Sequence, residues 1–185
     1  MRAVGRVFGR DGRDESAGPA AAELVVVDER VLAGGGGPDA AWLCARLSGA
    51  GVPASRLTVL PPEVTVLSRE VAAALVRSPS VLVVVGDGPV HEAVGMAAGL
   101  PMVPEPDEHG GQELELPAGA APIPNPAGGR PGVIVESRGT LVVCLPGDDA
   151  QLRAMWSGPV AEVLHIRLGP ADDGNPPPAQ DVSGR

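Results

Sequence analysis

The segment GDGPVHE, residues 86–92, carries the residue types best suited to chemistry. Small residues in a turn let backbone N–H groups approach a phosphate, and a helix that begins there favours negative charge. His91 could bind a phosphate or transfer a proton near neutral pH, and Glu92 offers a carboxylate to a metal ion. The glycine spacing matches neither the dinucleotide-binding fingerprint nor a Walker A loop. The segment therefore predicts a ligand-binding turn, with an ordinary tight turn as the alternative.

The elements around this segment alternate between strand and helix. Apolar runs predict buried strands at 23–27, 57–60 and 81–85, and helices are expected at 39–50, 64–77 and 91–98. This alternation predicts an α/β fold, in which a mostly parallel sheet is covered by helices on both faces. Ligands bind beyond the carboxyl ends of the strands in such sheets. Two acidic turns follow strands here: Asp28-Glu29 after the first, and the segment 86–92 after the third.

The rest of the chain is organised around this core. We expect a domain at 22–168 between disordered tails, residues 1–21 and 169–185, which are rich in glycine, proline and charge. Within the domain, 101–131 is a Pro/Gly-rich lobe or flap with a short strand at 113–116. The sequence then predicts a hairpin of 132–136 with 140–144, a helix at 148–156 capped by Asp148 or Asp149, and a last strand at 163–168.

Composition excludes several classes of partner. The formal net charge is −9, and there are one Phe, two Trp and no Tyr. An acidic surface repels phosphate backbones and few aromatic rings are available to stack on bases, so no nucleic-acid partner is expected. A small anionic ligand would need local positive groups or a bound cation. The sequence has no apolar run of the length that spans a membrane, so no membrane partner is expected either.

The cysteines and the first residues bear on location. Cys44 and Cys144 form no motif, and we interpret them as buried small hydrophobic residues of a reducing compartment. The first 13 residues are rich in Arg, but Asp11, Asp14 and Glu15 interrupt the acid-poor pattern of a transit peptide. We expect a cytoplasmic protein, with a mitochondrial location as the alternative.

Three segments taken in order resemble the MoaB/Mog superfamily of molybdopterin-binding domains. They are Asp28-Glu29 after the first strand, the Gly86-x-Gly88-Pro89 turn after the third, and Leu145-Pro146-Gly147 before a late helix. Within the superfamily the chain is most similar to the branch of CinA proteins and the N-terminal domain of eukaryotic FAD synthase. WLCARL at 42–47, VLPPEV at 59–64 and the place of His91 carry this closer resemblance. It covers residues 22–168.

The resemblance implies a three-layer α/β/α fold, often oligomeric, with a site for a phosphate-bearing ligand such as an FAD-like nucleotide or molybdopterin. It implies that the ligand is bound by Gly86, Asp87, Gly88, Pro89, Pro146 and Gly147. In the FAD synthase branch it also implies metal-dependent hydrolysis of a nucleotide pyrophosphate. Asp28, Glu29 and Glu92 would then bind Mg²⁺ or Co²⁺, and Glu92 and His91 would act in catalysis.

The chain departs from the superfamily pattern at several positions. The pattern has Gly at the position of Val27, Thr at Val90, a second acid at Ala93 and another Thr near Gly95. Losing a metal ligand weakens metal binding, so we expect weak or lost pyrophosphatase activity. No segment resembles the FAD-synthesising domain, so FAD synthesis is not assigned.

Two other functions stay open beside this one. The first is a non-catalytic module for scaffolding or self-association, and the second is molybdopterin binding in molybdenum cofactor biosynthesis. Each candidate residue also has a structural interpretation. Glu92 could complement the helix dipole, His91 could be an exposed residue at a helix start, and Asp28-Glu29 could form a solvated turn.

Overall fold

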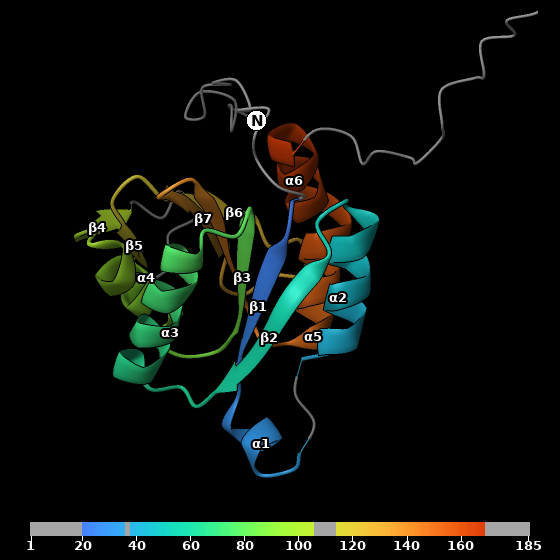
Figure 1. Ribbon diagram of the computed structural model, residues 1–185, viewed down its shortest axis with the longest axis horizontal. Coiled ribbons are helices and arrows are strands. Elements are labelled where there is room, and N and C mark those ends of the chain that lie inside the picture. The colour runs from blue at the N-terminus through green and yellow to red at the C-terminus, as the bar shows by residue number, and fades with distance from the viewer. Residues whose placement is uncertain (1–19, 36–37, 106–113, 169–185) are drawn as a thin grey trace, which may run out of the picture.

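A six-stranded sheet forms the centre of the protein, in the order β2-β1-β3-β8-β7-β6 (Figure 1). The computed structural model describes residues 20–35, 38–105 and 114–168, so the expected tails lie outside the described residues except for Ala20 and Ala21. The strands of the sheet are β1 (Ala22–Val27), β2 (Ala54–Leu60), β3 (Val81–Gly86), β6 (Ala121–Ile123), β7 (Gly132–Ser137) and β8 (Thr140–Leu145).

The sheet is mostly parallel, as the alternation of elements predicted. β2, β1, β3 and β8 run parallel to one another, whereas β7 and β6 complete the sheet in antiparallel pairings. The predicted hairpin is confirmed as β7 and β8, which turn at Arg138 and Gly139, both with positive φ. β1, β3 and β8 are buried along their whole length, which explains their unbroken apolar runs.

Helices cover both faces of the sheet and complete a three-layer α/β/α fold. On one face lie α2 (Ala40–Gly49), α5 (Asp149–Met155) and α6 (Ala161–Leu168), and on the other lie α3 (Val64–Arg77) and α4 (Val90–Ala98) (Figure 1). Alternate residues of β3 point to opposite layers: Val83 packs with the α2 side, and Val84 with the α3 side. The predicted fold class is confirmed.

The 101–131 segment contains more regular structure than its composition suggested. β4 (Met102–Glu105) and β5 (Leu114–Pro117) form a separate antiparallel ribbon, which packs beside α4. Leu116 of this ribbon is buried in the same core as α3 and α4. The short strand expected at 113–116 is therefore confirmed as β5, and the ribbon extends one helical layer.

The last element was predicted wrongly. Residues 163–168 do not form a strand, because α5 continues through a π-helical turn (Trp156–Val160) into α6. Trp156, Val160 and Leu164 are buried at i, i+4 and i+8, which is helical spacing, whereas Ile166 is 69% exposed. The apolar residues of 163–168 are compatible with the alternation of a strand as well as with the spacing of a helix. The short helix α1 (Glu29–Leu32), directly after β1, was predicted only as a turn.

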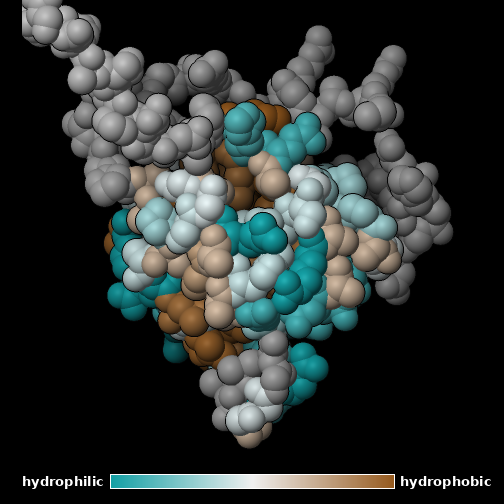
Figure 2. Space-filling model, turned by 90° about the vertical axis from the view of Figure 1, so that its right-hand side faces the viewer, coloured by the Kyte–Doolittle hydropathy of each residue, from teal (hydrophilic) through white to brown (hydrophobic). Residues whose placement is uncertain are grey.

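Apolar side chains on the surface are dispersed. Figure 2 shows the α2 side of the molecule as a mixture of hydrophilic and weakly hydrophobic residues, with small hydrophobic groups near its lower edge and its top. The large exposed hydrophobic residues belong to five different elements: Leu57, Val76, Met96, Val103 and Ile166. No helix among the described residues combines the length and apolar character that crossing a membrane requires.

Candidate functional site

The strand register brings three turns to one edge of the sheet. Val27 of β1 pairs with Gly86 of β3, and Val85 of β3 pairs with Leu145 of β8, so the parallel strands end at the same level. Asp28, Asp87 and Pro146 each follow one of these ends. The sequence predicted this convergence, because carboxyl ends of parallel strands share an edge.

The backbones of the three turns are in close contact. A Cβ atom added to Gly147 would lie 3.1 Å from the Cα atom of Gly86 and 3.3 Å from the backbone nitrogen of Asp87. Gly88 has a φ of +116° and faces Pro62. Glycine at these positions therefore serves the packing of the turns, whether or not a ligand binds.

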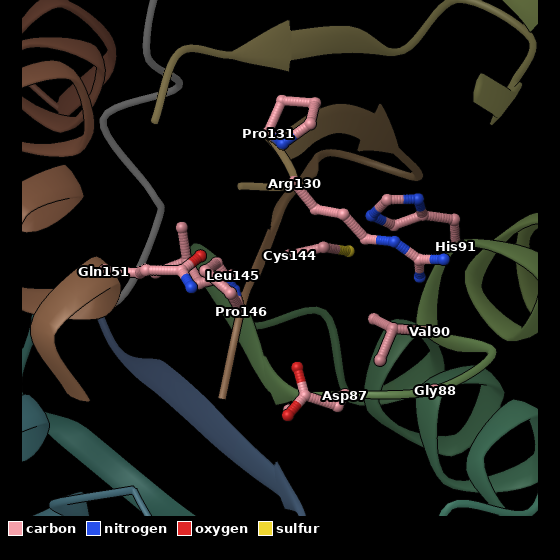
Figure 3. A pocket seen from close by; sticks show the side chains of 11 residues that line it. Asp87, Gly88, Val90, His91, Arg130, Pro131, Cys144, Leu145, Pro146 and Gln151 are labelled. Carbon is pink, nitrogen blue, oxygen red and sulfur yellow. The ribbon is translucent and has the colours of Figure 1, made fainter. Parts of the chain in front are cut away.

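The first of two hollows at this edge, which we call the His91 pocket, has a volume of about 140 Å³. Three connections line it: the β3–α4 turn, the residues after β8, and the β6–β7 connection (Figure 3). The predicted residues among its walls are Gly86, Asp87, Gly88, His91 and Pro146. Pro89 stands at the N-terminal cap position of α4, directly between two of these residues, and is half-buried.

His91 and Arg130 face each other in this pocket. The imidazole of His91 projects from the first turn of α4, and the guanidinium of Arg130 approaches it from the opposite wall (Figure 3). Burial, and then the positive charge of Arg130, lower the pKa of His91 from its ordinary value of 6.5. The lowered pKa favours the neutral imidazole of His91, and Arg130 supplies a positive charge to the pocket.

The second hollow, which we call the Asp28 pocket, adjoins the first through Asp87 and has a volume of about 240 Å³. Its walls include Asp28 and Glu29, and Gly147 closes one side. The Asp28 carboxylate accepts hydrogen bonds from Arg30, from Nη2 at 2.8 Å and from Nε at 3.1 Å. The hydrogen bond and charge of Asp28 raise the pKa of Arg30, and Asp87 adds to this effect.

The predicted metal ligands are not assembled into one set. Glu92 is exposed on α4 and lines neither pocket, while Asp28 and Glu29 line the second. Among the residues that the structure describes, no three His, Cys, Asp or Glu side chains form a group that could hold a metal ion. The metal roles of Asp28, Glu29 and Glu92, and the catalytic roles of Glu92 and His91, stay predictions.

Two polar residues that line the His91 pocket, Arg130 and Gln151, were missed by sequence reasoning. Arg130 lies in the 101–131 segment, where no periodicity indicates which way a side chain points. Its residue type was the available indication, because it is the only Lys or Arg of that segment and follows two glycines. Gln151 lies in the first turn of α5, where Asp148 caps the helix by accepting from the Gln151 backbone nitrogen at 3.0 Å. The predicted cap is confirmed, but the side chain of Gln151 carried no signal.

The fold is that of solved CinA and molybdopterin biosynthesis proteins, so the resemblance inferred from the sequence is confirmed at the level of the fold. A solved structure of the protein CinA from Thermoplasma acidophilum has a TM-score of 0.68 at 20% identity, covering 78% of this chain and 98% of its own. A molybdopterin biosynthesis protein from Mycobacterium abscessus has a TM-score of 0.58 at 19% identity, with coverage of 80% and 94%.

The chain is also similar in sequence to several proteins, some of which are named CinA-like. A protein of Aeropyrum pernix is 34% identical over 148 residues, which is 68% of this chain and 55% of the relative. A CinA-like protein of Frankia casuarinae is 26% identical over 179 residues, 80% of this chain and 41% of the relative. The chain thus spans about half the length of the curated relatives it matches. No family model matches it.

Proposed function

We propose that this chain is a MoaB/Mog-type molybdopterin-binding domain of the FAD synthase and CinA kind. It binds a phosphate-bearing nucleotide and has weak or lost pyrophosphatase activity. The observation that carries the proposal is the convergence of three turns around two adjoining pockets, with Asp87 in the walls of both. Glycine backbone, the start of α4 and a cation meet in the His91 pocket, and this combination suits a phosphate group.

The size of the pockets indicates how such a ligand would lie. Sites for whole drug-sized ligands have volumes of about 300–1,000 Å³. The His91 pocket, at about 140 Å³, suits one charged group, and the larger Asp28 pocket beside it could accept another part of the same molecule. A nucleotide with its phosphates in the first pocket would extend along the edge of the sheet toward the second.

Reduced catalysis follows from two features of the site. Hydrolysis of a pyrophosphate needs a divalent cation, here Mg²⁺ or Co²⁺, to neutralise phosphate oxygens and activate water. The superfamily pattern puts a second acid at the position of Ala93, which is fully buried in the core beneath α4. Asp28 is hydrogen-bonded to Arg30. The carboxylate of Asp28 is therefore already engaged by a cation, which weakens it as a ligand for such an ion.

One assay tests this function. Purified protein is incubated with FAD and Mg²⁺ or Co²⁺, release of FMN and AMP is measured, and binding of FAD and ADP-ribose is measured by calorimetry. Slow turnover that disappears in Glu92→Ala, but not in the control Glu63→Ala, supports a weak hydrolase. Glu63 is an exposed acid before α3 and lines neither pocket. Binding without turnover supports a binding domain that has lost the activity.

Molybdopterin is the alternative phosphate-bearing ligand, because solved proteins with this fold are named for molybdopterin biosynthesis. Tighter binding of molybdopterin than of FAD would favour it. The absence of any binding would favour the scaffold or self-association module, which the apolar Ala93 also suits. A cytoplasmic location and a homo-oligomer belong to the same proposal.

A further inference from the structure

The charged group of Arg130 is unusual among the arginines of this protein. In residues 20–35, 38–105 and 114–168, Arg130 makes no ion pair with a carboxylate. Five other arginines there do: Arg30, Arg56, Arg77, Arg153 and Arg167. Arg46, Arg69 and Arg138 are likewise without such a pair within those ranges, but none of them lines either pocket. Arg130 therefore combines an unneutralised charge with a place in a pocket wall, in a chain whose net charge is −9.

The connection that carries this side chain, residues 124–131, we call the Arg130 loop. Asn125 fixes its path: Nδ2 donates to the backbone oxygen of Arg130 at 3.0 Å and to Oε1 of Gln151 at 2.8 Å. Oδ1 of Asn125 accepts from the backbone nitrogen of Ala127 at 3.1 Å. The side chain of Asn125 thus joins the two ends of the loop to each other and to Gln151 of α5.

Two glycines let the loop pack closely. Gly128 and Gly129 have φ values of +79° and +94°, which disfavour residues with a Cβ atom. A Cβ atom on Gly129 would lie 2.9 Å from Oε1 of Gln151, the same oxygen that accepts from Asn125. These contacts hold the loop against α5, and in this conformation Arg130 is directed toward His91 (Figure 3).

We propose that Arg130 is the cation that binds the phosphate of the ligand in the His91 pocket, and that Asn125 is the residue that positions it. The inference rests on the proposed function and specifies the ligand class as multiply charged phosphates, such as a nucleoside diphosphate or pyrophosphate. A planar guanidinium can form two parallel hydrogen bonds to one phosphate. The structure leaves this guanidinium without a carboxylate that would compete for it in the described residues.

The first test compares binding of ADP, inorganic pyrophosphate and adenosine to the wild-type chain, Arg130→Gln and Arg69→Gln by calorimetry. Both variants lose one positive charge, but Arg69 is exposed on α3 and lines neither pocket. We expect Arg130→Gln to weaken ADP and pyrophosphate binding about 10- to 100-fold. Arg69→Gln should change it about twofold or less, since exposed distant charges are screened. Adenosine, which has no phosphate, should bind both variants as it binds the wild type.

The outcomes separate this inference from the proposed function. If ADP binds wild type and Arg130→Gln equally, a nucleotide site remains and the role of Arg130 is refuted. If wild type binds neither ADP nor pyrophosphate, both proposals fail. Pyrophosphate binding that depends on Arg130, without binding or hydrolysis of FAD, supports the role of Arg130 and contradicts the FAD-type function.

The second test asks whether Asn125 acts through Arg130. Asn125→Ala should weaken ADP binding, and the double variant with Arg130→Gln should bind no more weakly than Arg130→Gln alone. Adenosine binding should not change. If the losses in ADP binding free energy of the two single variants add in the double variant, Asn125 acts independently of Arg130 and its positioning role is refuted. Thermal unfolding of each variant verifies that the fold is retained.

Discussion

Gly86 and Val27 touch through their backbones at the carboxyl edge of the sheet. A Cβ atom placed on Gly86 would lie only 2.3 Å from the carbonyl oxygen of Val27 and 2.7 Å from its Cβ atom. Val27 is itself buried in the core beneath α3. The ends of β1 and β3 can therefore approach this closely only because Gly86 has no side chain.

This contact predicts a large stability difference between two glycine substitutions. Gly86→Ala combines an unfavourable φ of +154° with a clash against backbone, so we expect a loss of about 3 kcal/mol or more. Gly99→Ala is the matched control, because its φ is +70° but nothing lies within 4 Å of the added Cβ atom. Backbone strain alone should cost about 1 kcal/mol there. Urea unfolding measures both, and equal losses would contradict the close contact.

A second prediction concerns Glu23 and Arg77, on the side of the core covered by α3. Glu23 is 5% exposed, and its carboxylate accepts two hydrogen bonds from Arg77, at 2.7 and 2.6 Å. Removing the cation leaves a buried charge, so Arg77→Met should cost about 3 kcal/mol. Glu23→Gln keeps an acceptor and leaves an arginine that can reach water, so it should cost about 1 kcal/mol.

Denaturant unfolding of both variants measures this asymmetry, with Arg69→Met on the same helix as the control. Arg56 lies 4.0 Å from Glu23 and could replace part of the lost interaction. If Arg77→Met and Arg69→Met are equally stable, the buried pair does not contribute as the geometry indicates.

The sequence predicts the central layer because local signals there agree with the global fold. The apolar run 81–85 must be covered on both faces, and the glycines after it end the strand at the edge where open α/β sheets generally bind their ligands. Strand 57–60 was predicted too short, since β2 begins at Ala54 with residues that stay partly exposed at the edge of the sheet. The apolar pattern and the turn residues thus predict the buried strands of the core, but not where a strand at the edge of the sheet begins.

The walls of the His91 pocket were harder to predict because they depend on contacts between residues far apart in the sequence. Asn125 and Gln151 are 26 residues apart, and their hydrogen bond places the loop that carries Arg130. No pattern in 124–131 indicates that partner. The error at 163–168 has a different cause, because the i, i+4 spacing begins at Trp156, before the segment that was assigned to a strand.

The third prediction concerns the proton affinity of His91. Burial lowers its pKa, and the charge of Arg130 lowers it further. In an NMR titration, Arg130→Gln should therefore raise the pKa of His91 part of the way toward 6.5, because burial remains, whereas Arg69→Gln should leave it unchanged. A His91→Gln variant identifies the resonance among the three histidines. An unchanged pKa in Arg130→Gln would show that the two groups are not neighbours in solution.

The same shift makes stability depend on pH with a defined sign. Below pH 6.5 the unfolded chain binds a proton at His91 that the folded chain does not bind, so this contribution is complete above 6.5 and declines as the pH falls toward the lowered value. The difference in unfolding free energy between wild type and His91→Gln should therefore change with pH in that window and be constant above it. A constant difference throughout would contradict a lowered pKa.

The fourth prediction concerns Cys144, whose side chain is buried at the edge of the His91 pocket. Burial raises the pKa of this thiol from its ordinary value to about 12. At pH 8, about four units lower, roughly one molecule in ten thousand carries the reactive thiolate.

In a Cys44→Ser variant, a disulfide reagent should therefore modify Cys144 only as fast as the protein unfolds, and the rate should rise with denaturant. The half-buried Cys44, measured in Cys144→Ser, should react faster in the native state. Rapid modification of native Cys44→Ser would mean that the pocket opens to the thiol, which the burial of Cys144 does not allow.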